Sequence, residues 1–320
     1  MSKSNKNKTI VLQGNWSEYT FKPLLSSSRL RKISKFSRVY RGTSNEGKPV
    51  VVKVLPDEIA KDPYSLDCFK KEVNWFGTHP NILAPFEYII QDNRHFLISE
   101  MVQGINLGYY YRHKRLFKKN RIKLALKCGL QLLDAVEYIH NKGLIHADIK
   151  PANVMLLTSR RKRIDVNNPF FQLIDFGMVR RAGEIPQSNK KTQRPFVLVY
   201  SPPEQVLGFH ELIGFHSDLY NIALLMYEMI TKEPVYESNL SVKLMNLQTS
   251  FPLPNNKTIP SELMNILHKA ASKYHFKKPP NHYKRDAIYH RLQLGIENRY
   301  HSANEFRQAL KEFEHLYFRE

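Results

Sequence analysis

The stretch His146-Ala147-Asp148-Ile149-Lys150-Pro151-Ala152-Asn153 decides the fold of this chain, together with Asp175-Phe176-Gly177 further along the sequence. Two shorter pieces flank them, Val51-Val52-Lys53 upstream and Ser201-Pro202-Pro203-Glu204 downstream. Each piece alone is a weak signal, because a lone lysine on a strand usually faces solvent and Asp-Phe-Gly is usually a turn. Four such pieces in this order are hard to obtain by chance, so we treat them as one chemical constellation.

The composition excludes several classes of protein. Among 320 residues, 42% are hydrophobic and 12% aromatic, which rules out a disordered or low-complexity chain. Only Cys68 and Cys128 are present, so there is no disulfide framework and a reducing compartment is favoured. No run approaches the roughly 20 apolar residues of a membrane helix. The net charge of +20 leaves nucleic acid, anionic lipid, an acidic protein or simple solubility open.

The apolar pattern changes character after the first hundred residues. Up to about Thr20 the chain is polar and we expect a loose tail. Apolar β-branched runs, turn residues and helical periodicity then give the following expected elements. They are a hairpin of residues 39–40 and 49–55 around a Gly/Asn turn, a helix over 63–76, strands over 82–90 and 95–99, and helices over 120–141, 217–231, 261–272 and 303–318. The sequence thus predicts a small lobe of mostly sheet with one helix, a connector near Met101–Gly104 and a larger helical lobe.

With these pieces in place, the chain resembles the eukaryotic-type (Hanks-type) Ser/Thr protein kinases, which also occur in bacteria. His146 to Asn153 has the form His-x-Asp-x-Lys-Pro-x-Asn of their catalytic loop, and the resemblance extends from about Arg29 to Phe318. It implies an α+β, bilobal protein-kinase fold with a β-rich N-lobe, one regulatory helix and a mostly helical C-lobe. The boundaries we expect are an N-terminal extension of residues 1–24 and a kinase domain of 25–318, with the N-lobe at about 25–101, the hinge at 101–105 and the C-lobe at 106–318.

Two further matches lie in the predicted C-lobe. Asp218 stands where the family has its central helix, and Asn298 to Ala303 resembles a late motif of the bacterial members. In that motif the arginine, here Arg299, pairs with the glutamate matched by Glu204. Asp218 and Arg299 are expected to be structural residues on either interpretation of the chain.

The resemblance assigns roles around the phosphates of ATP. Lys53 would hold the α- and β-phosphates, and Glu72 would pair with Lys53 and fix it. Asn153 and Asp175 would hold Mg²⁺, which prefers oxygen ligands. Glu72 lies closer to the following His-Pro-Asn motif than is usual in the family, so Glu58, or a solvated face, remains an alternative for that position.

Further roles concern the acceptor hydroxyl and the adenine. Asp148 would orient the substrate hydroxyl and accept its proton, and Lys150 would neutralise the transferring phosphoryl group. The backbone of Glu100 and Val102 would bind adenine, and Val51 would stand above it in place of the usual alanine.

The phosphate-covering loop departs from the family. Aligned on Phe36 and Val39, residues 32–39 read Lys-Ile-Ser-Lys-Phe-Ser-Arg-Val, without any of the three expected glycines. Serine, here Ser34 and Ser37, is the smallest polar replacement, and Lys32 would add charge above the phosphates. Two interpretations follow: an altered but working lid, or a weakened nucleotide site.

Two departures bear on regulation and on the acceptor. Ala147 replaces the arginine that receives an activation-loop phosphate in the family, so we expect activity that does not depend on phosphorylation between Gly177 and Ser201. Phe196-Val197 replaces the usual Gly-Thr, which weakens the assignment of the acceptor class. Lys150 still favours Ser/Thr.

Two basic stretches account for part of the charge. One contains Arg160 to Arg163 within a longer insertion, and the other, residues 109–123, holds seven Lys or Arg residues and no acidic ones. A solvated face is one interpretation. The other is recognition of an acidic or phosphorylated protein, with nucleic acid or anionic membrane as less expected partners.

The sequence therefore predicts an ATP- and Mg²⁺-dependent protein kinase that phosphorylates Ser or Thr of a protein substrate. The alternatives are a pseudokinase scaffold, a small-molecule or lipid kinase and, last, a nucleic-acid-binding module. We expect a cytoplasmic protein without a membrane span, of bacterial or viral origin, with secretion into a host cell as the other possibility. The oligomeric state stays open.

Overall fold

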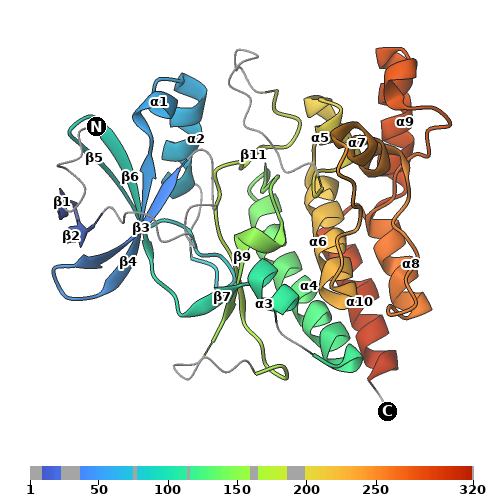
Figure 1. The fold of residues 1–320 in the computed structure, drawn as a ribbon, viewed down its shortest axis with the longest axis horizontal. Helices are drawn as coiled ribbons and strands as arrows, with labels where there is room; N and C mark the ends of the chain where they lie inside the picture. Colours follow the sequence, from blue (N-terminus) through green and yellow to red (C-terminus); the bar gives the residue numbers. More distant parts are fainter. Residues whose placement is uncertain are drawn as a thin grey trace.

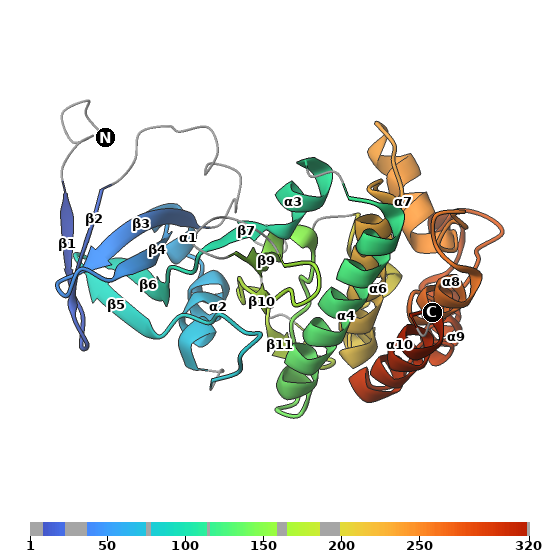
Figure 2. The same ribbon diagram turned by 90° about the horizontal axis from the view of Figure 1, so that it is seen from below.

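The computed structural model describes residues 9–22, 37–74, 78–113, 116–158, 165–185 and 199–318. Figures 1 and 2 show a sheet-rich lobe at the N-terminal end and a larger helical lobe at the C-terminal end, with short strands between them. The predicted α+β bilobal architecture is confirmed.

The N-lobe is built on one antiparallel sheet with the strand order β1-β2-β3-β4-β6-β5. Its strands are β1 (Ile10–Gln13), β2 (Glu18–Phe21), β3 (Arg38–Ser44), β4 (Pro49–Leu55), β5 (Glu87–Gln91) and β6 (Arg94–Glu100). The predicted hairpin is present as β3 and β4, which turn at residues 45–48.

The first two strands correct the sequence prediction. Strand β2 pairs with β3 through Phe21 and Gly42, so residues 10–21 belong to the N-lobe sheet and are not a loose extension ahead of it. The side chain of Gln91 joins the two edge strands, because its Nε2 donates to Val11 O at 2.8 Å and its Oε1 accepts from Gln13 N at 3.0 Å. These bonds curl the sheet so that β1 meets β5.

Two short helices complete the N-lobe, α1 (Asp57–Ala60) and α2 (Pro63–Asn74). The predicted helix over 63–76 is present as far as Asn74, and residues 75–77 lie outside the described part of the chain. Phe69 of α2 packs against Leu55 and Leu97 on one face of the sheet. That contact fixes α2 beside β4.

The expected strand over residues 82–90 is too long. Strand β5 begins at Glu87, and the residues before it pair with the C-lobe instead. Leu83 N donates to Leu173 O at 2.9 Å and Leu173 N donates to Asn81 O at 2.8 Å. These bonds tie the segment after α2 to the other lobe.

The connector between the lobes is short. Strand β6 ends at Glu100, and β7 (Gly104–Asn106) already pairs with the C-lobe strand β9 (Val154–Leu157), which pairs in turn with β10 (Phe171–Leu173). Residues 101–103 are thus the only part of the predicted hinge that belongs to neither sheet.

The C-lobe is a helical layer around α4 and α6. Its helices are α3 (Leu107–His113), α4 (Lys118–His140), α5 (Pro203–Val206), α6 (Phe215–Thr231), α7 (Ser241–Ser250), α8 (Ser261–Ala270), α9 (Arg285–Glu297) and α10 (Ala303–Tyr317). It also contains β8 (Leu144–Ile145), β11 (Arg180–Arg181) and 3-10 turns at Pro151–Asn153, His210–Leu212 and Pro280–His282. The four long helices predicted here are present, whereas α3, α5, α7 and α9 were not predicted.

Helix α6 is buried along most of its length and forms the centre of the lobe. A Cβ at Gly129 of α4 would lie 2.5 Å from Met226 Sδ of α6, so glycine allows these two helices to approach closely. Across the described residues, no helix is both long and apolar enough to cross a membrane.

Candidate active site

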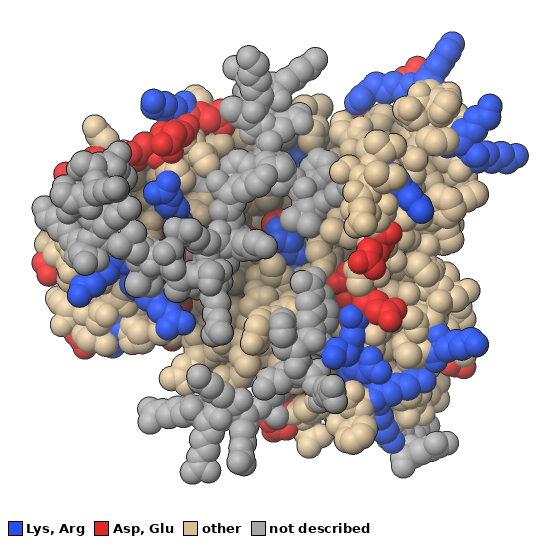
Figure 3. Space-filling view, in the orientation of Figure 1, with Lys and Arg blue, Asp and Glu red and all other residues tan. Residues whose placement is uncertain are grey.

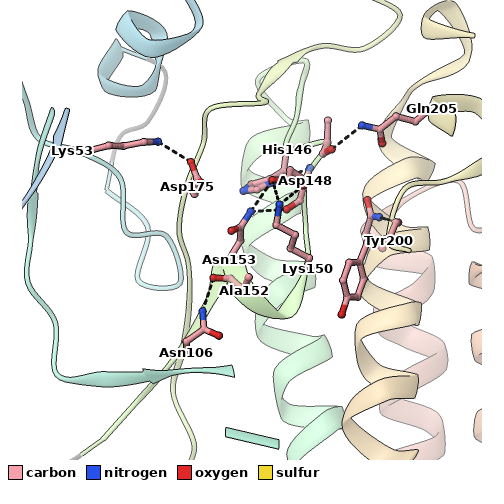
Figure 4. A network of polar contacts seen from close by, with 12 residues as sticks. Lys53, Asn106, His146, Asp148, Lys150, Ala152, Asn153, Asp175, Tyr200 and Gln205 are labelled. Atoms are coloured by element: carbon pink, nitrogen blue, oxygen red, sulfur yellow. Dashed lines mark hydrogen bonds and ion pairs between the residues drawn. The ribbon is translucent and has the colours of Figure 1, made fainter. Parts of the chain in front are cut away.

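Lys53 on β4 is held by two carboxylates from different lobes. Its Nζ lies 2.9 Å from both carboxylate oxygens of Glu72 on α2 and 2.8 Å from Asp175 Oδ1. The expected pair is therefore made with Glu72, and Glu58 on α1 takes no part in it. Figure 4 shows Lys53 reaching across the cleft to Asp175.

The strand register explains why Lys53 faces the cleft. Val50 and Val52 are in the core of the sheet, so the alternate residues Val51 and Lys53 point to the opposite face. Lys53 lies directly across from Val39 in the ladder and Val51 from Ser99. Val51, which is predicted to stand above the adenine, and Val39, a further predicted nucleotide-binding residue, are both half-buried on this face.

The other predicted adenine contacts lie at the end of the ladder. Glu100 is the last residue of β6 and faces Val50, and Val102 follows in the connector. The structure thus brings Glu100 and Val102 to the end of the cleft at which the two lobes join.

The catalytic loop forms a compact cluster around Asp148. Lys150 Nζ lies 2.8 and 2.6 Å from the two carboxylate oxygens of Asp148. Asn153 Nδ2 donates to Asp148 O and to Asp148 Oδ2, both at 2.9 Å. Figure 4 places Asp175 and Asn153 between Lys53 on one side and Asp148 with Lys150 on the other. Six predicted residues are thus assembled in one cleft.

The two aspartates of the cleft are shifted in opposite directions. Burial raises the pKa of Asp148, and this effect outweighs the opposing attraction of Lys150. Burial alone would also raise the pKa of Asp175, but the Lys53 ammonium outweighs it and lowers the pKa to about 2. Carboxylates separated in this way are suited to different tasks, one as a proton acceptor and one as a permanent anion.

Lys53 keeps its charge in this setting. Burial works against the ammonium, but Asp175 and Glu72 outweigh it and raise the pKa of Lys53. A fixed positive charge is therefore present where the phosphates of a nucleotide are expected.

The residue before Asp148 has an unusual backbone. Ala147 has φ of 60°, a conformation that costs a non-glycine residue roughly 1–2 kcal/mol. The buried carboxylate of Asp218 holds it in place by accepting the N–H groups of His146 at 2.8 Å and Ala147 at 2.9 Å. Asp218 thus serves the catalytic loop from the central helix, where the sequence placed it.

His146 is a packed residue and not a proton carrier. Its ring lies edge-on to Phe176 with centroids 5.2 Å apart, and its Nδ1 accepts from Asp148 N at 3.3 Å. Burial lowers the pKa of His146, so the ring is neutral near pH 7. These contacts hold the Asp-Phe-Gly segment against the catalytic loop.

The phosphate-covering loop is only partly described. Lys32 and Ser34 lie outside the described residues, and Ser37 is the first residue after that gap. Ser37 is buried, and within the described residues its Oγ has no hydrogen-bond partner.

The donor set fits Mg²⁺ and a polyphosphate. Asp175 offers a carboxylate and Asn153 a carboxamide oxygen, since the Asn153 nitrogen is already bonded to Asp148. The described residues contain no group of three or more His, Cys, Asp or Glu that could hold a metal. Two oxygen side chains suit Mg²⁺, which keeps waters and substrate phosphates as its other ligands.

A second charged network lies inside the C-lobe, between α5 and the segment that joins α9 to α10. Arg299 forms two parallel bonds to Glu204, at 2.8 and 3.0 Å, and its Nε donates to Ser272 O at 2.8 Å. Ser217 Oγ donates to Glu204 at 2.8 Å. Burial would raise the pKa of Glu204, but Arg299 outweighs it and lowers the pKa. The Glu204–Arg299 pair expected from the late motif is present.

The basic stretches are only partly described, and two cations of the second stretch bind backbone carbonyl groups. Arg160 to Arg163 lie outside the described residues. In the other stretch, Arg121 Nη1 donates to Ile230 O at 2.6 Å and Lys118 Nζ to Lys257 O at 3.3 Å. Figure 3 nevertheless shows Lys and Arg side chains gathered at the lower right, where helix α4 begins.

Two supporting residues were not predicted. Asn106 caps α3, because its Oδ1 accepts from Gly108 N at 3.1 Å, and its Nδ2 donates to Ala152 O at 2.5 Å. Gln205 Nε2 donates to Ala147 O at 3.3 Å. An asparagine ahead of a helix is an N-cap signal that would have pointed to Asn106, whereas Gln205 has no local signal because its partner is far away in sequence.

Comparison with known proteins gives a consistent result. A family model described as the protein kinase domain matches residues 33–282. A probable serine/threonine-protein kinase of Streptomyces coelicolor is 31% identical over 197 residues, which is 59% of this chain and 27% of that protein. The probable serine/threonine-protein kinase PknB of Lactococcus lactis is 25% identical over 260 residues, 77% of this chain and 39% of the relative. This chain thus covers well under half of these relatives.

The fold also matches solved structures. Two crystal structures of the Mycobacterium tuberculosis PknI kinase domain, a single and a double mutant, align with TM-scores of 0.58 and 0.57 at 19% and 18% identity. Each covers 98% of this chain and 99% of the PknI chain. At this identity the likeness concerns the fold alone.

Proposed function

This chain belongs to the protein kinase family, and from that premise we propose that it transfers the γ-phosphoryl group of ATP to serine or threonine hydroxyls of a protein. One observation carries the proposal: Lys53, Glu72 and Asp175 form one hydrogen-bonded group, and Asp148, Lys150 and Asn153 form another in the same cleft. Phosphoryl transfer needs positioning and charge neutralisation more than covalent chemistry, and this arrangement supplies both.

Each side chain has a task that its surroundings support. Lys53, fixed by Glu72, holds phosphate oxygens. Asp148 orients the acceptor hydroxyl and takes its proton, for which its raised pKa is favourable. Lys150, bonded to Asp148, neutralises charge on the transferring group.

ATP and Mg²⁺ would be held by the same cleft. Val39, Val51 and the backbone of Glu100 and Val102 would bind the adenine, with Lys32, Ser34 and Ser37 on the phosphate side. Asn153 and Asp175 would hold the metal. When bound, Mg²⁺ supplies neutralisation of the phosphate charge.

The acceptor class rests on Lys150 and on the relatives. Lys150 occupies the position typical of Ser/Thr kinases, and both curated relatives above are described as serine/threonine-protein kinases. We propose an acidic or phosphorylated protein as substrate, because the +20 charge includes the cluster at the start of α4. A cytoplasmic location agrees with Cys68 and Cys128, which are both buried and are not joined by a disulfide.

A pseudokinase scaffold is the second candidate, and the glycine-free phosphate loop favours it. Without glycines the backbone approaches phosphates less closely, so nucleotide binding could survive while transfer is lost. This candidate predicts a protein that binds a partner or a nucleotide without phosphorylating anything.

The test is a labelling experiment with γ-labelled ATP, Mg²⁺ and a cell lysate, using Asp175→Ala as the inactive control. We expect labelled proteins with wild type only, and labelled phosphoserine or phosphothreonine after acid hydrolysis. Labelling that is equal in the control, or absent across a broad panel of protein substrates, would rule the proposal out.

A further inference from the structure

Helix α9 (Arg285–Glu297) lies beyond residue 282, where the match to the kinase family ends. Figure 1 shows α9 at the far end of the helical lobe, along the same edge as α5 and β11. One face of the helix meets the segment between α5 and α6. On that face Arg285 stacks over Phe209 at 4.2 Å, and Tyr289 lies 6.1 Å from the same ring.

The helix is firmly anchored on its other side. A Cβ at Gly295 would lie 2.6 Å from Tyr274 N and 2.9 Å from Lys273 Cα, so only glycine allows this close crossing. Arg291 stacks over Tyr283 at 4.7 Å, and Leu292 is buried. The position of α9 is therefore fixed by packing on two sides.

A pocket of 320 Å³ lies between the last turn of α9, residues 211–216 at the start of α6, and residues 182–183 of the activation region, the segment between Gly177 and Ser201. This volume is at the lower end of the range for ligand pockets. Apolar walls come from Leu212, Ile213 and Ile296, and the backbone of Gly183 lines the pocket beside them. Gly183 N donates to Ile213 O at 2.9 Å, so the wall is tied together by the main chain.

The pocket is negative, in contrast to the chain as a whole. Glu211 and Glu297 both line it. Glu297 is the last residue of α9, whose final turn has no basic side chain, so its carboxylate adds to the negative end of the helix dipole. His216, also in the lining, has its pKa lowered mainly by burial and adds no positive charge near neutral pH.

The carboxylates are not committed to strong partners. Glu211 meets Arg285 at 3.5 Å, and both side chains are exposed, so this pair is weak. Among the described residues, Glu297 makes no ion pair. A cation with an apolar stem would satisfy both features of the pocket: the carboxylates by its head and the apolar walls by its stem.

A single residue, Ile213, separates the pocket from the loop that contains Asp148. Ile213, one of its walls, packs directly against Ala147 and Ile145. Ala147 precedes the catalytic aspartate and stands where the family carries its phosphate-receiving arginine. An occupant of the pocket would thus rest on residues that support the catalytic loop.

We propose that this pocket binds an arginine side chain of a partner protein that docks beside the activation region. Arginine fits better than lysine, because its planar head can donate to two carboxylates from different elements at once. The site requires no nucleotide and no phosphoryl transfer, so it goes beyond the proposed function.

The test uses the peptide acetyl-Gly-Leu-Arg-Leu-Gly-amide and a twin in which citrulline, uncharged and of the same shape, replaces arginine. Backbone amide shifts of Gly183 and Gly214 are followed by NMR on deuterated full-length protein. We expect saturable shifts with the arginine peptide. The citrulline peptide should bind with an affinity lower by about fivefold or more, because it lacks the contribution of an exposed ion pair.

Variants give the matched comparison. Glu297→Lys should lower the affinity for the arginine peptide by about fivefold or more. Glu312→Lys, which makes the same charge change at an exposed site of α10, should leave that affinity unchanged. The Asp175→Ala protein should bind the peptide as wild type does, which separates this site from catalysis. Equal binding of the citrulline twin, an unaffected Glu297→Lys protein, or no saturable shift would overturn the proposal.

Discussion

Two charged networks, one inside the C-lobe and one between the lobes, use the same kinds of side chain in different surroundings. Inside the C-lobe, Arg299 and Glu204 are 1% and 0% exposed, and neighbouring groups satisfy them further. In the cleft, Lys53 and Asp175 keep 14% and 23% of their side chains exposed, and their bond joins two lobes. The Glu204–Arg299 network can only stabilise the fold, because no ligand can reach it. The cleft network holds charges that a ligand can reach.

The largest effect is expected from a substitution in the Glu204–Arg299 network. Arg299→Met leaves the Glu204 carboxylate buried without its cation, so we expect the free energy of unfolding to fall by about 3–5 kcal/mol. Urea unfolding measures it. Lys127→Met, which breaks the partly exposed pair of Lys127 with Glu314, is the control and should cost about 1 kcal/mol or less. A small loss for Arg299→Met, or loss of activity without loss of stability, would contradict the structural role.

In the cleft, the effect should appear in the rate and not in stability. Lys150→Met removes the cation beside Asp148, and we expect phosphoryl transfer to slow by roughly 10²–10³-fold. Initial rates with saturating ATP measure it. Lys311→Met, at an exposed site on α10, should leave the rate unchanged. A Lys150→Met protein with a rate within a factor of about three of wild type would remove Lys150 from the mechanism.

The next change tests how Lys53 is positioned. Glu72→Gln keeps the shape but removes the charge that fixes Lys53, so we expect the rate to fall by about 10²-fold. Steady-state kinetics should be compared with Glu58→Gln, which changes an exposed residue of α1 that takes no part in the pair. Similar losses in both variants would mean that the pairing does not matter for transfer.

The Lys53–Asp175 bond also has a signature in pH. The pKa of Asp175 is lowered to about 2 in the folded protein, so its contribution to stability is complete above its unfolded pKa of 3.8. That contribution, about 2 kcal/mol, is lost as the pH falls through about 2. The difference in unfolding free energy between wild type and Asp175→Asn should therefore shrink from pH 5 to pH 2. A difference that stays constant over this range would contradict the lowered pKa.

The smallest effect concerns the activation region. Because Ala147 replaces the phosphate-receiving arginine, changing Ser188 and Thr192 together to alanine should alter the rate by less than about tenfold. Phosphorylation with and without the double substitution can be compared directly in purified protein. A larger loss of rate would show that phosphorylation of Ser188 or Thr192 affects the cleft through residues other than the one at position 147.

The residues of the cleft could be predicted from the sequence because most of them lie in short motifs in which the spacing between residues is fixed. Asp148, Lys150 and Asn153 lie within six positions, and Lys53 sits on a strand whose alternation is plain. The uncertainty about Glu72 was resolved only by the fold, since the pair spans α2 and β4.

What the sequence did not predict depends on distant partners. Strands β1 and β2 are four residues each, which is too short for a clear hydrophobic pattern. The turn between them is stabilised by Glu87, a residue distant in sequence, whose carboxylate accepts from Tyr19 Oη at 2.6 Å and from Asn15 N. Helix α9 has an apolar face at Leu292 and Ile296, but its charged and aromatic residues hide the periodicity. Its position is set by Phe209 and by the close crossing at Gly295, which no local pattern shows.

The central claim is that the cleft network performs transfer despite the glycine-free loop. The most direct test measures ATP affinity and phosphoryl transfer in the same preparations of wild type and Asp148→Ala. We expect both proteins to bind ATP with similar affinity in Mg²⁺ and only wild type to transfer phosphate to protein. Wild-type protein that binds ATP and transfers nothing would contradict the account and leave the scaffold interpretation in its place.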